Sequence, residues 1–168
     1  MVDLAGLYLG IKRLPASVGW IERDSENLVL VSPVEIDGVV VEGLRFRLTA
    51  MRSMPEEAVT CQLEYHERRI VGGPFCRIDW RPIHRHDNRA IGPPELRHRR
   101  FTGSHHHEFN VNWTYAAAMV RRGNLPIVIP FDNEPQSFSE LIAFLEKELR
   151  IERLMSSVPR PPWQAGLF

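Results

Sequence analysis

Histidine and arginine side chains that could bind and cleave a phosphate ester are concentrated in one segment. Six of the seven histidines lie between His84 and His107, and residues 77–100 contain seven arginines against three acidic residues, a local formal charge of +4. Guanidinium groups bind phosphate through paired hydrogen bonds, and imidazole exchanges protons near neutral pH. Because the whole chain has no net charge, this segment predicts a local site for RNA or DNA.

The residue types match the needs of a metal-independent ribonuclease. Such an enzyme requires a base for the 2′-hydroxyl, an acid for the leaving 5′-oxygen and a cation for the charge that develops on phosphorus. We predict these catalytic roles for Arg77, Asp79, His84, His106 and Glu108. We predict contacts with the phosphate backbone for Arg45, Arg81, Arg85, Arg97, Arg99 and Arg100.

Two H-x-H pairs support an alternative interpretation as a metal site. Residues two apart on a strand point the same way, so the pairs could present four imidazoles, from His84, His86, His105 and His107. Imidazole suits divalent transition metals, although no standard zinc motif is present. The leading interpretation therefore expects no cofactor, and the alternative expects a divalent transition metal. A third interpretation is a non-enzymatic module in which the same segment binds an acidic protein.

The surrounding sequence predicts mostly strands before residue 82 and a helix near the end. Alternating or β-branched residues predict strands at 27–32, 34–36, 39–51, 56–66, 75–81 and 105–113. Asp37-Gly38 is typical of a hairpin turn, and the short links favour an antiparallel meander. Residues 82–104 are expected to be irregular, 114–122 a short helix and 126–130 an edge strand. Ser137 and Glu140 form a capping box for an amphipathic helix over 138–152.

Strand parity separates an apolar face from a polar face. Leu44, Phe46, Leu48, Cys61, Ile78 and Trp80 share the apolar parity, which Phe109, Val111 and Trp113 continue if 105–113 is one strand. On that assumption His105 and His107 point toward the core, while His106 and Glu108 join Arg77 and Asp79 on the polar face. The pattern predicts a two-layer α+β fold, an antiparallel meander sheet with the C-terminal amphipathic helix packed on its apolar face. An ordinary solvated sheet surface would show the same polar face.

Length and composition predict one domain over residues 1–155, followed by a proline-rich tail over 156–168. Cys61 and Cys76 are expected to be reduced and packed, because two cysteines in apolar strands do not form a disulfide framework. The sequence contains no apolar run of bilayer length and no signal-peptide pattern at its start, which favours a cytoplasmic protein without membrane contact.

Two motifs resemble those of small bacterial proteins of the TumE-type toxin class and related families. The first is Arg77-Ile78-Asp79-Trp80-Arg81-Pro82-Ile83-His84, and the second is His105-His106-His107-Glu108. The resemblance covers about residues 60–152 and carries over Arg77, Asp79, Pro82, His84, His105 and His107. It implies a toxin-antitoxin or defence cluster, with a small DNA-binding antitoxin as partner and RNA as target. The sequence departs from the family pattern in the basic run 97–100, the long N-terminal meander and the proline-rich tail.

Overall fold

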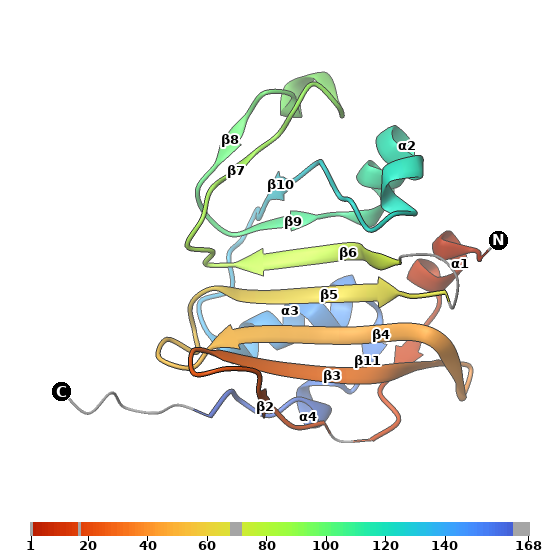
Figure 1. Ribbon diagram of the computed structural model, residues 1–168, viewed down its shortest axis with the longest axis vertical. Coiled ribbons are helices and arrows are strands. Elements are labelled where there is room, and N and C mark those ends of the chain that lie inside the picture. Colours follow the sequence, from red (N-terminus) through yellow and green to blue (C-terminus); the bar gives the residue numbers. More distant parts are fainter. Residues whose placement is uncertain (1, 17, 68–71, 163–168) are drawn as a thin grey trace.

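The computed structural model describes residues 2–16, 18–67 and 72–162. Within these ranges, nine strands form one sheet in the order β10-β9-β6-β5-β4-β3-β1-β11, with β2 paired to β3, and β7 and β8 form a second, two-stranded sheet (Figure 1). The strands are β1 (Lys12–Arg13), β2 (Ile21–Glu22), β3 (Asn27–Ile36), β4 (Val39–Met51), β5 (Val59–Tyr65), β6 (Gly73–Trp80), β7 (His86–Asp87), β8 (Arg100–Phe101), β9 (His105–His107), β10 (Ile129–Pro130) and β11 (Ile151–Glu152). The helices are α1 (Leu4–Leu9), α2 (Phe109–Val120), α3 (Phe138–Glu148) and α4 (Leu154–Ser157), with a 3-10 turn η1 (Pro94–Leu96).

Strands β3 to β6 form an antiparallel meander, each paired with the next. Asp37 and Gly38 turn the chain between β3 and β4 with φ angles of 53° and 76°. Only a few residue types tolerate this left-handed conformation, and Asp-Gly is a favoured pair at such turns. The predicted α+β class and the predicted antiparallel meander are therefore confirmed.

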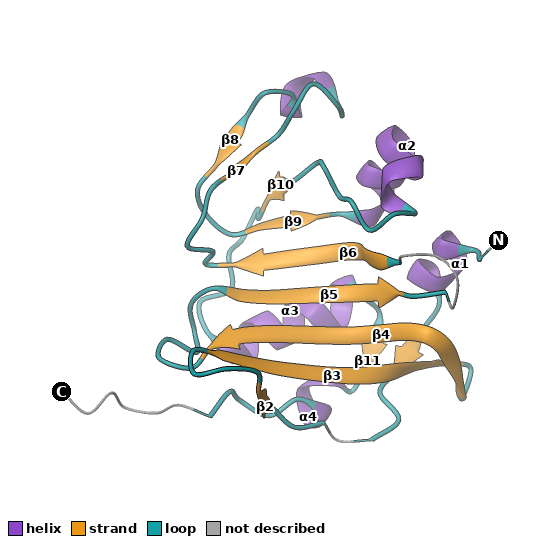
Figure 2. Ribbon diagram, in the orientation of Figure 1, coloured by secondary structure: helices purple, strands orange, loops and turns teal. Residues whose placement is uncertain are grey.

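The core lies on one side of this sheet. Phe46, Cys61 and Ile78 are almost fully buried, as their parity predicts, and belong to one hydrophobic cluster. The buried side chains of α3 belong to the same cluster, and α3 lies behind β4 and β5 (Figure 2). Ser137 caps α3 by accepting a hydrogen bond from the Glu140 amide at 3.2 Å. Cys61 and Cys76 are free and buried, as predicted.

Residues 109–113 form the start of α2, so the predicted strand over 105–113 is wrong beyond His107. The Glu108 carboxylate ends the strand by accepting hydrogen bonds from the backbone amides of Asn110 and Val111, at 2.9 and 2.7 Å. Phe109 and Asn112 are then buried three residues apart, which is a helical spacing. The sequence is ambiguous here because alternate apolar residues fit a strand, whereas the helix cap depends on one acidic side chain.

Residues 82–104 are more ordered than predicted. They leave the end of β6, form the β7–β8 hairpin and return to β9 (Figure 1). Asn88 anchors this hairpin, because its buried side chain exchanges two hydrogen bonds with the Val128 backbone at 2.9 and 3.0 Å and donates a third to the Leu96 carbonyl. The connection between β6 and β9 is therefore a projecting arm with a fixed base, and residues 82–104 are named here the hairpin arm.

The N-terminal segment is joined to the end of α3 by a buried lysine. Lys12 is fully buried, and its ammonium group donates hydrogen bonds to the carbonyls of Tyr8, Gly10 and Leu149 at 2.6, 2.8 and 3.1 Å. Val158, at the start of the predicted tail, is also buried in the core, whereas residues 163–168 lie outside the described part of the chain. Across the described ranges, no helix has the length and apolarity needed to cross a membrane.

Candidate functional site

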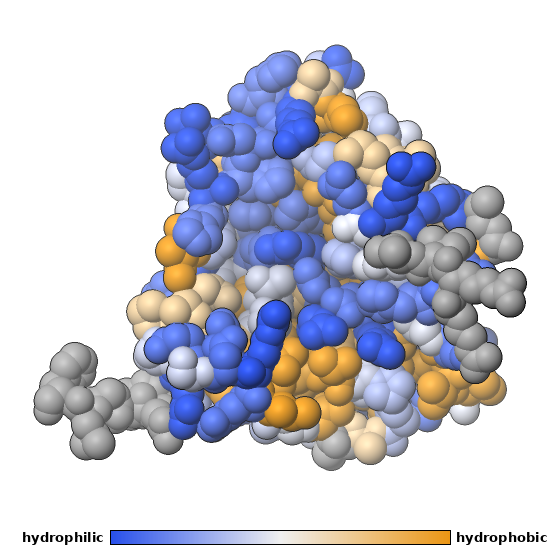
Figure 3. All heavy atoms as spheres, viewed as in Figure 1, coloured by the Kyte–Doolittle hydropathy of each residue, from blue (hydrophilic) through white to orange (hydrophobic). Residues whose placement is uncertain are grey.

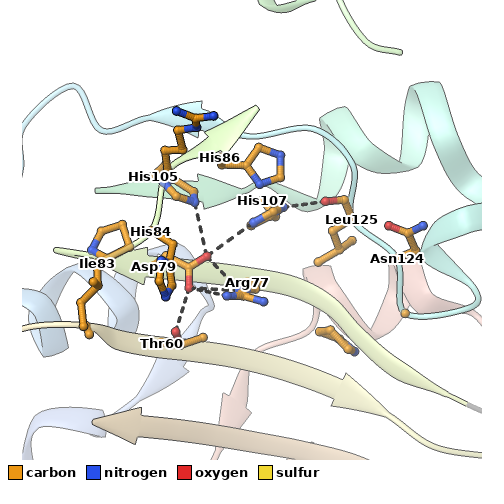
Figure 4. A pocket seen from close by; sticks show the side chains of 15 residues that line it. Thr60, Arg77, Asp79, Ile83, His84, His86, His105, His107, Asn124 and Leu125 are labelled. Carbon is orange, nitrogen blue, oxygen red and sulfur yellow. Dashed lines mark hydrogen bonds and ion pairs between the residues drawn. The ribbon is translucent and has the colours of Figure 1, made fainter. Parts of the chain in front are cut away.

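A cavity of about 450 Å³ lies where the polar face of the sheet meets the base of the hairpin arm. Its lining includes Thr60, Arg77, Asp79, His84, His86, His105 and His107 (Figure 4). In the space-filling view, hydrophilic residues gather over β6, β9 and the hairpin arm, above an apolar area over β3 and β4 (Figure 3). The cavity therefore brings four of the six clustered histidines together with Arg77 and Asp79.

The side of β9 that faces the cavity is the opposite of the predicted one. Asp79 pairs with His105, and Arg77 pairs with His107, so these four side chains lie on the same face of the sheet. The prediction that His105 and His107 point toward the core is wrong. The prediction assumed that 105–113 is one strand and assigned the faces of His105 and His107 from the apolar residues of 109–113. Those residues lie in a helix, so their alternation does not indicate which way the side chains of β9 point.

His106 and Glu108 do not join the cavity, which corrects their predicted position beside Arg77. His106 points to the other face, where its ring lies 5.6 Å from the ring of Phe131 and its Nδ1 is 3.9 Å from the Glu148 carboxylate. Burial lowers the pKa of His106, and Nδ1 is buried without a hydrogen-bond partner in the described chain. The Glu108 carboxylate caps α2. Neither side chain can therefore reach a phosphate held by Arg77.

Asp79 is the centre of the polar network in the cavity. It is 3% exposed, and it accepts hydrogen bonds from the Thr60 hydroxyl at 2.8 Å and from Nε and Nη2 of Arg77 at 2.8 to 3.0 Å. Burial alone would raise the pKa of Asp79, but the rings of His105 and His107 and the Arg77 guanidinium outweigh burial and hold it well below its usual range. Asp79 is therefore a fixed carboxylate whose Oδ2 faces two imidazoles.

The hydrogen bonds of His105 and His107 determine which nitrogen of each ring faces Asp79. Nδ1 of His105 lies 2.8 Å from the Gly103 carbonyl, and Nδ1 of His107 lies 2.7 Å from the Leu125 carbonyl. A carbonyl only accepts hydrogen bonds, so each Nδ1 carries a proton, and each Nε2 either donates to Asp79, if the ring is protonated, or carries a lone pair, if the ring is neutral. Both Nε2 atoms lie 3.5 Å from Asp79 Oδ2. With both rings neutral, three acceptors would face one another here, and a cation bound between them would relieve this arrangement.

His86 brings a third imidazole to this point from the hairpin arm. Its ring centroid lies 5.0 Å from that of His107 and 5.7 Å from that of His105. One nitrogen from each of the three rings lies within 4.8 Å of the other two, and Nε2 of His86 is buried without a hydrogen-bond partner in the described ranges. Burial and the charges of the other two rings lower the pKa of His86, and burial lowers the pKa of His107. Unprotonated imidazoles are the form that binds metals.

The distances from Asp79 to the rings of His105 and His107 are close to the spacing of ligands around a divalent transition metal ion. Zinc bonds to nitrogen and oxygen at about 2.1 Å, so two ligands of a tetrahedral site lie about 3.4 Å apart. The Asp79 oxygen is 3.5 Å from each of two ring nitrogens. Histidine ligands commonly donate their other N–H to a backbone carbonyl, as His105 and His107 do. His86, His105 and His107 therefore form a candidate metal centre beside Asp79, and it opens into the cavity.

The predicted arginines fall into separate groups. Arg85 lines the cavity, and Arg97, Arg99 and Arg100 are exposed on the hairpin arm. Arg81 instead has a structural contact, since its guanidinium donates to the carbonyls of Glu56 and Gln136. Arg45 is exposed on β4, outside the cavity lining.

His84, the fourth predicted histidine, lines the cavity but does not belong to the cluster of three. Sequence reasoning missed Thr60 as a partner of Asp79, although its polar parity on β5 was a usable signal. The backbone carbonyls of Gly103 and Leu125 left no signal in the sequence, because carbonyls are present at every residue.

Comparisons of the chain with protein-family models, with curated proteins and with solved structures found no match. The resemblance to TumE-type toxins therefore stays a prediction, and the interpretation of the site depends on its geometry.

Proposed function

We propose that this protein is a metal-dependent phosphodiesterase that acts on single-stranded RNA. The observation that carries the proposal is the convergence of His86, His105 and His107 beside Asp79 at the wall of an open cavity. A divalent ion held there would act as a Lewis acid toward a phosphoryl oxygen and would lower the pKa of a bound water molecule. Ligands on one side and a cavity on the other are the arrangement of catalytic rather than structural metal sites.

Arg77 supports an anionic substrate. Its Nε and Nη2 donate to Asp79, while its Nη1 donates to no acceptor in the described residues. The Arg77 side chain is 41% exposed, so the free edge of its guanidinium is available to a phosphate in the cavity. Asp79 fixes the orientation of Arg77, which reduces the conformational entropy lost when the substrate binds.

The hairpin arm supports a polymeric substrate. Residues 85–100 contain five arginines against Asp87 and Glu95, a formal charge of +3, so the rest of the chain is net acidic. All five arginines are exposed, and Arg85 also lines the cavity. Several exposed cations on an arm that begins at the cavity suit a phosphate backbone better than a single phosphate. A cavity of about 450 Å³ has the size of a small-molecule site, which favours a single strand over a duplex.

The proposal replaces the metal-independent mechanism expected from the sequence. That mechanism assigned His106 and Glu108 to the reaction, and both lie away from Arg77. Arg77, Asp79 and His84 keep predicted roles in the cavity. A small antitoxin as partner and membership of a toxin-antitoxin cluster stay predictions from the sequence.

Titration of untagged protein with Zn²⁺, followed by calorimetry, tests the metal centre. We expect one ion per chain and a rise in Kd of more than about 100-fold for His107→Ala, because loss of an outer partner alone costs about 10 to 100-fold. His98→Ala is the matched control, since His98 is an exposed histidine of the hairpin arm outside the cluster. The absence of stoichiometric binding, or equal losses in the two variants, would refute the metal centre.

Fluorescence anisotropy with a labelled oligouridylate tests the substrate. Each phosphate contact contributes about −0.7 to the slope of log K against log salt for a single strand. Arg89 and Arg99 have no carboxylate within ion-pair distance among the described residues, so the double alanine variant is expected to make the slope less negative by about 1.4. Arg23→Ala, an exposed arginine beside β2 at the other end of the sheet, is the control. A slope unchanged by the double variant argues against RNA on the hairpin arm.

A further inference from the structure

A row of polar side chains crosses the sheet from the cavity, away from the hairpin arm. Arg47 on β4 is opposite Gln62 on β5, and Gln62 is opposite Arg77 on β6. Side chains directly opposite one another in an antiparallel pair lie on the same face of the sheet. Arg77 lines the cavity, so these three residues, named here the sheet row, begin at the cavity and extend over β5 and β4 (Figure 1).

The two arginines of the sheet row are oriented in the same way. Nε of Arg47 donates to the Glu64 carboxylate at 2.8 Å, and Nε of Arg77 donates to the Asp79 carboxylate at the same distance. Both acidic side chains are buried, at 8% and 5% exposed, whereas those of Arg47 and Arg77 are 29% and 41% exposed. In each pair the group that faces solvent is therefore the cation. The terminal nitrogens of Arg47 donate to no acceptor in the described part of the chain.

Gln62 lies between these two arginines, and its side chain is partly exposed. Its amide makes no hydrogen bond among the residues that the structure describes, so the amide N–H is free to donate to a phosphate oxygen. Arg45 lies on the same face of β4 and is exposed without an ion-pair partner in the described ranges. An anion on the sheet row would therefore meet two oriented guanidinium groups, an amide donor and one further positive charge.

We propose that the sheet row binds the phosphate backbone of the RNA strand on the side of the cleaved phosphate that lies away from the hairpin arm. This assignment rests on the proposed function. Neighbouring strands are about 4.8 Å apart, so the backbone at Arg47 lies about 10 Å from the backbone at Arg77. A stacked strand rises about 3.4 Å per nucleotide, so about three nucleotides span this distance. The substrate thus passes from the hairpin arm over the metal centre to the sheet row.

Arg47→Gln tests the sheet row through the length of the substrate. Hexauridylate is long enough to reach from the metal centre to Arg47. Its hydrolysis by Zn²⁺-loaded protein is expected to lose about 10-fold or more in kcat/KM, the effect of one lost hydrogen bond to a charged group. Diuridylate has one phosphodiester, which lies at the metal centre, so its kcat/KM is expected to change much less. Arg47→Lys keeps the charge and the pairing with Glu64 and is expected to recover most of the loss.

Arg52→Gln is the matched control. Arg52 directly follows β4 and, like Arg47, pairs with a carboxylate, that of Glu22 at 3.2 Å, with its own side chain 24% exposed. It lies outside the sheet row, so the variant is expected to hydrolyse both substrates as the wild type does. Gln62→Glu is a second test variant that breaks no hydrogen bond of the described chain. Its carboxylate repels phosphate, so the ratio of kcat/KM for hexauridylate over diuridylate is expected to fall here too.

Zn²⁺ affinity separates this assignment from the proposed function. Calorimetry is expected to give the same Kd for Arg47→Gln, for Gln62→Glu and for the wild type. A ratio of kcat/KM that stays at the wild-type value in both variants, while they bind Zn²⁺ normally, would overturn the sheet row and leave the metal centre standing. Failure of the wild type to bind Zn²⁺, or to hydrolyse either substrate when loaded, would overturn the proposed function and the sheet row together.

Discussion

Replacement of Lys12 by methionine is expected to destabilise the protein by about 4 kcal/mol. The ammonium group holds three backbone carbonyls, and its bonds to Tyr8 and Leu149 are fully buried. Methionine keeps the aliphatic stem but donates no hydrogen bond, so at least two buried carbonyls lose their partner at roughly 1–3 kcal/mol each. The loss is large beside a typical total stability of about 5–15 kcal/mol.

Urea denaturation followed by circular dichroism measures this loss. Arg13→Met is the matched control, because Arg13 is the next residue of β1 and forms an exposed ion pair with Glu152. The Arg13 side chain is 58% exposed and the Glu152 side chain 45%. Such exposed pairs contribute about 0–1 kcal/mol. If Lys12→Met costs no more than Arg13→Met, the buried ammonium group does not join the N-terminal segment to α3 in the way described.

Three further predictions concern the site and its surroundings. His106→Phe is expected to leave Zn²⁺ affinity unchanged within about threefold. It is expected to change the free energy of unfolding by at most about 1 kcal/mol, because it replaces an unpartnered buried nitrogen beside Phe131. Loss of Zn²⁺ binding in this variant would count against the orientation of β9. Burial, followed by the charge of Glu108, raises the pKa of Glu148. At pH values just above the ordinary glutamate pKa, the folded state therefore binds more protons than the unfolded state. Glu148 thus lowers the free energy of unfolding as pH rises through this range. Glu148→Gln is expected to gain stability over the wild type between pH 4 and pH 7 in urea titrations, and a constant difference contradicts this. Asn88→Ala is expected to weaken Zn²⁺ binding about 10-fold or more and to speed proteolysis within 82–104, since it releases the hairpin arm; normal protection would argue against this anchor.

The sheet was predictable because its signals are local and repeated. From Leu44 to Leu48 and from Val59 to Leu63 the alternation is regular, and a one-residue slip would expose every apolar side chain. Asp37-Gly38 then fixes the first turn. These elements require no knowledge of distant residues, which is why sequence and structure agree there.

The site was only partly predictable because it depends on one change of backbone geometry. The residue types were found, including Arg77, Asp79 and the H-x-H pairs. The boundary between β9 and α2 was not found. The alternate apolar residues after Glu108 fit a strand, and only the Glu108 side chain, which caps α2, indicates that a helix begins there. Moving that boundary reverses which of His105 and His106 faces Asp79. The hairpin arm, which delivers His86, depends on the contact of Asn88 with Val128, 40 residues away.

The ligands of the candidate metal centre come from two parts of the molecule with different mechanical properties. His105 and His107 lie on a strand paired on both sides, with β6 and β10, whereas His86 lies on an arm whose strands pair only with each other. An ion held by all three histidines would therefore link the arm to the sheet. The Asn88 anchor, two residues from His86, would then support the metal centre as well as the arm.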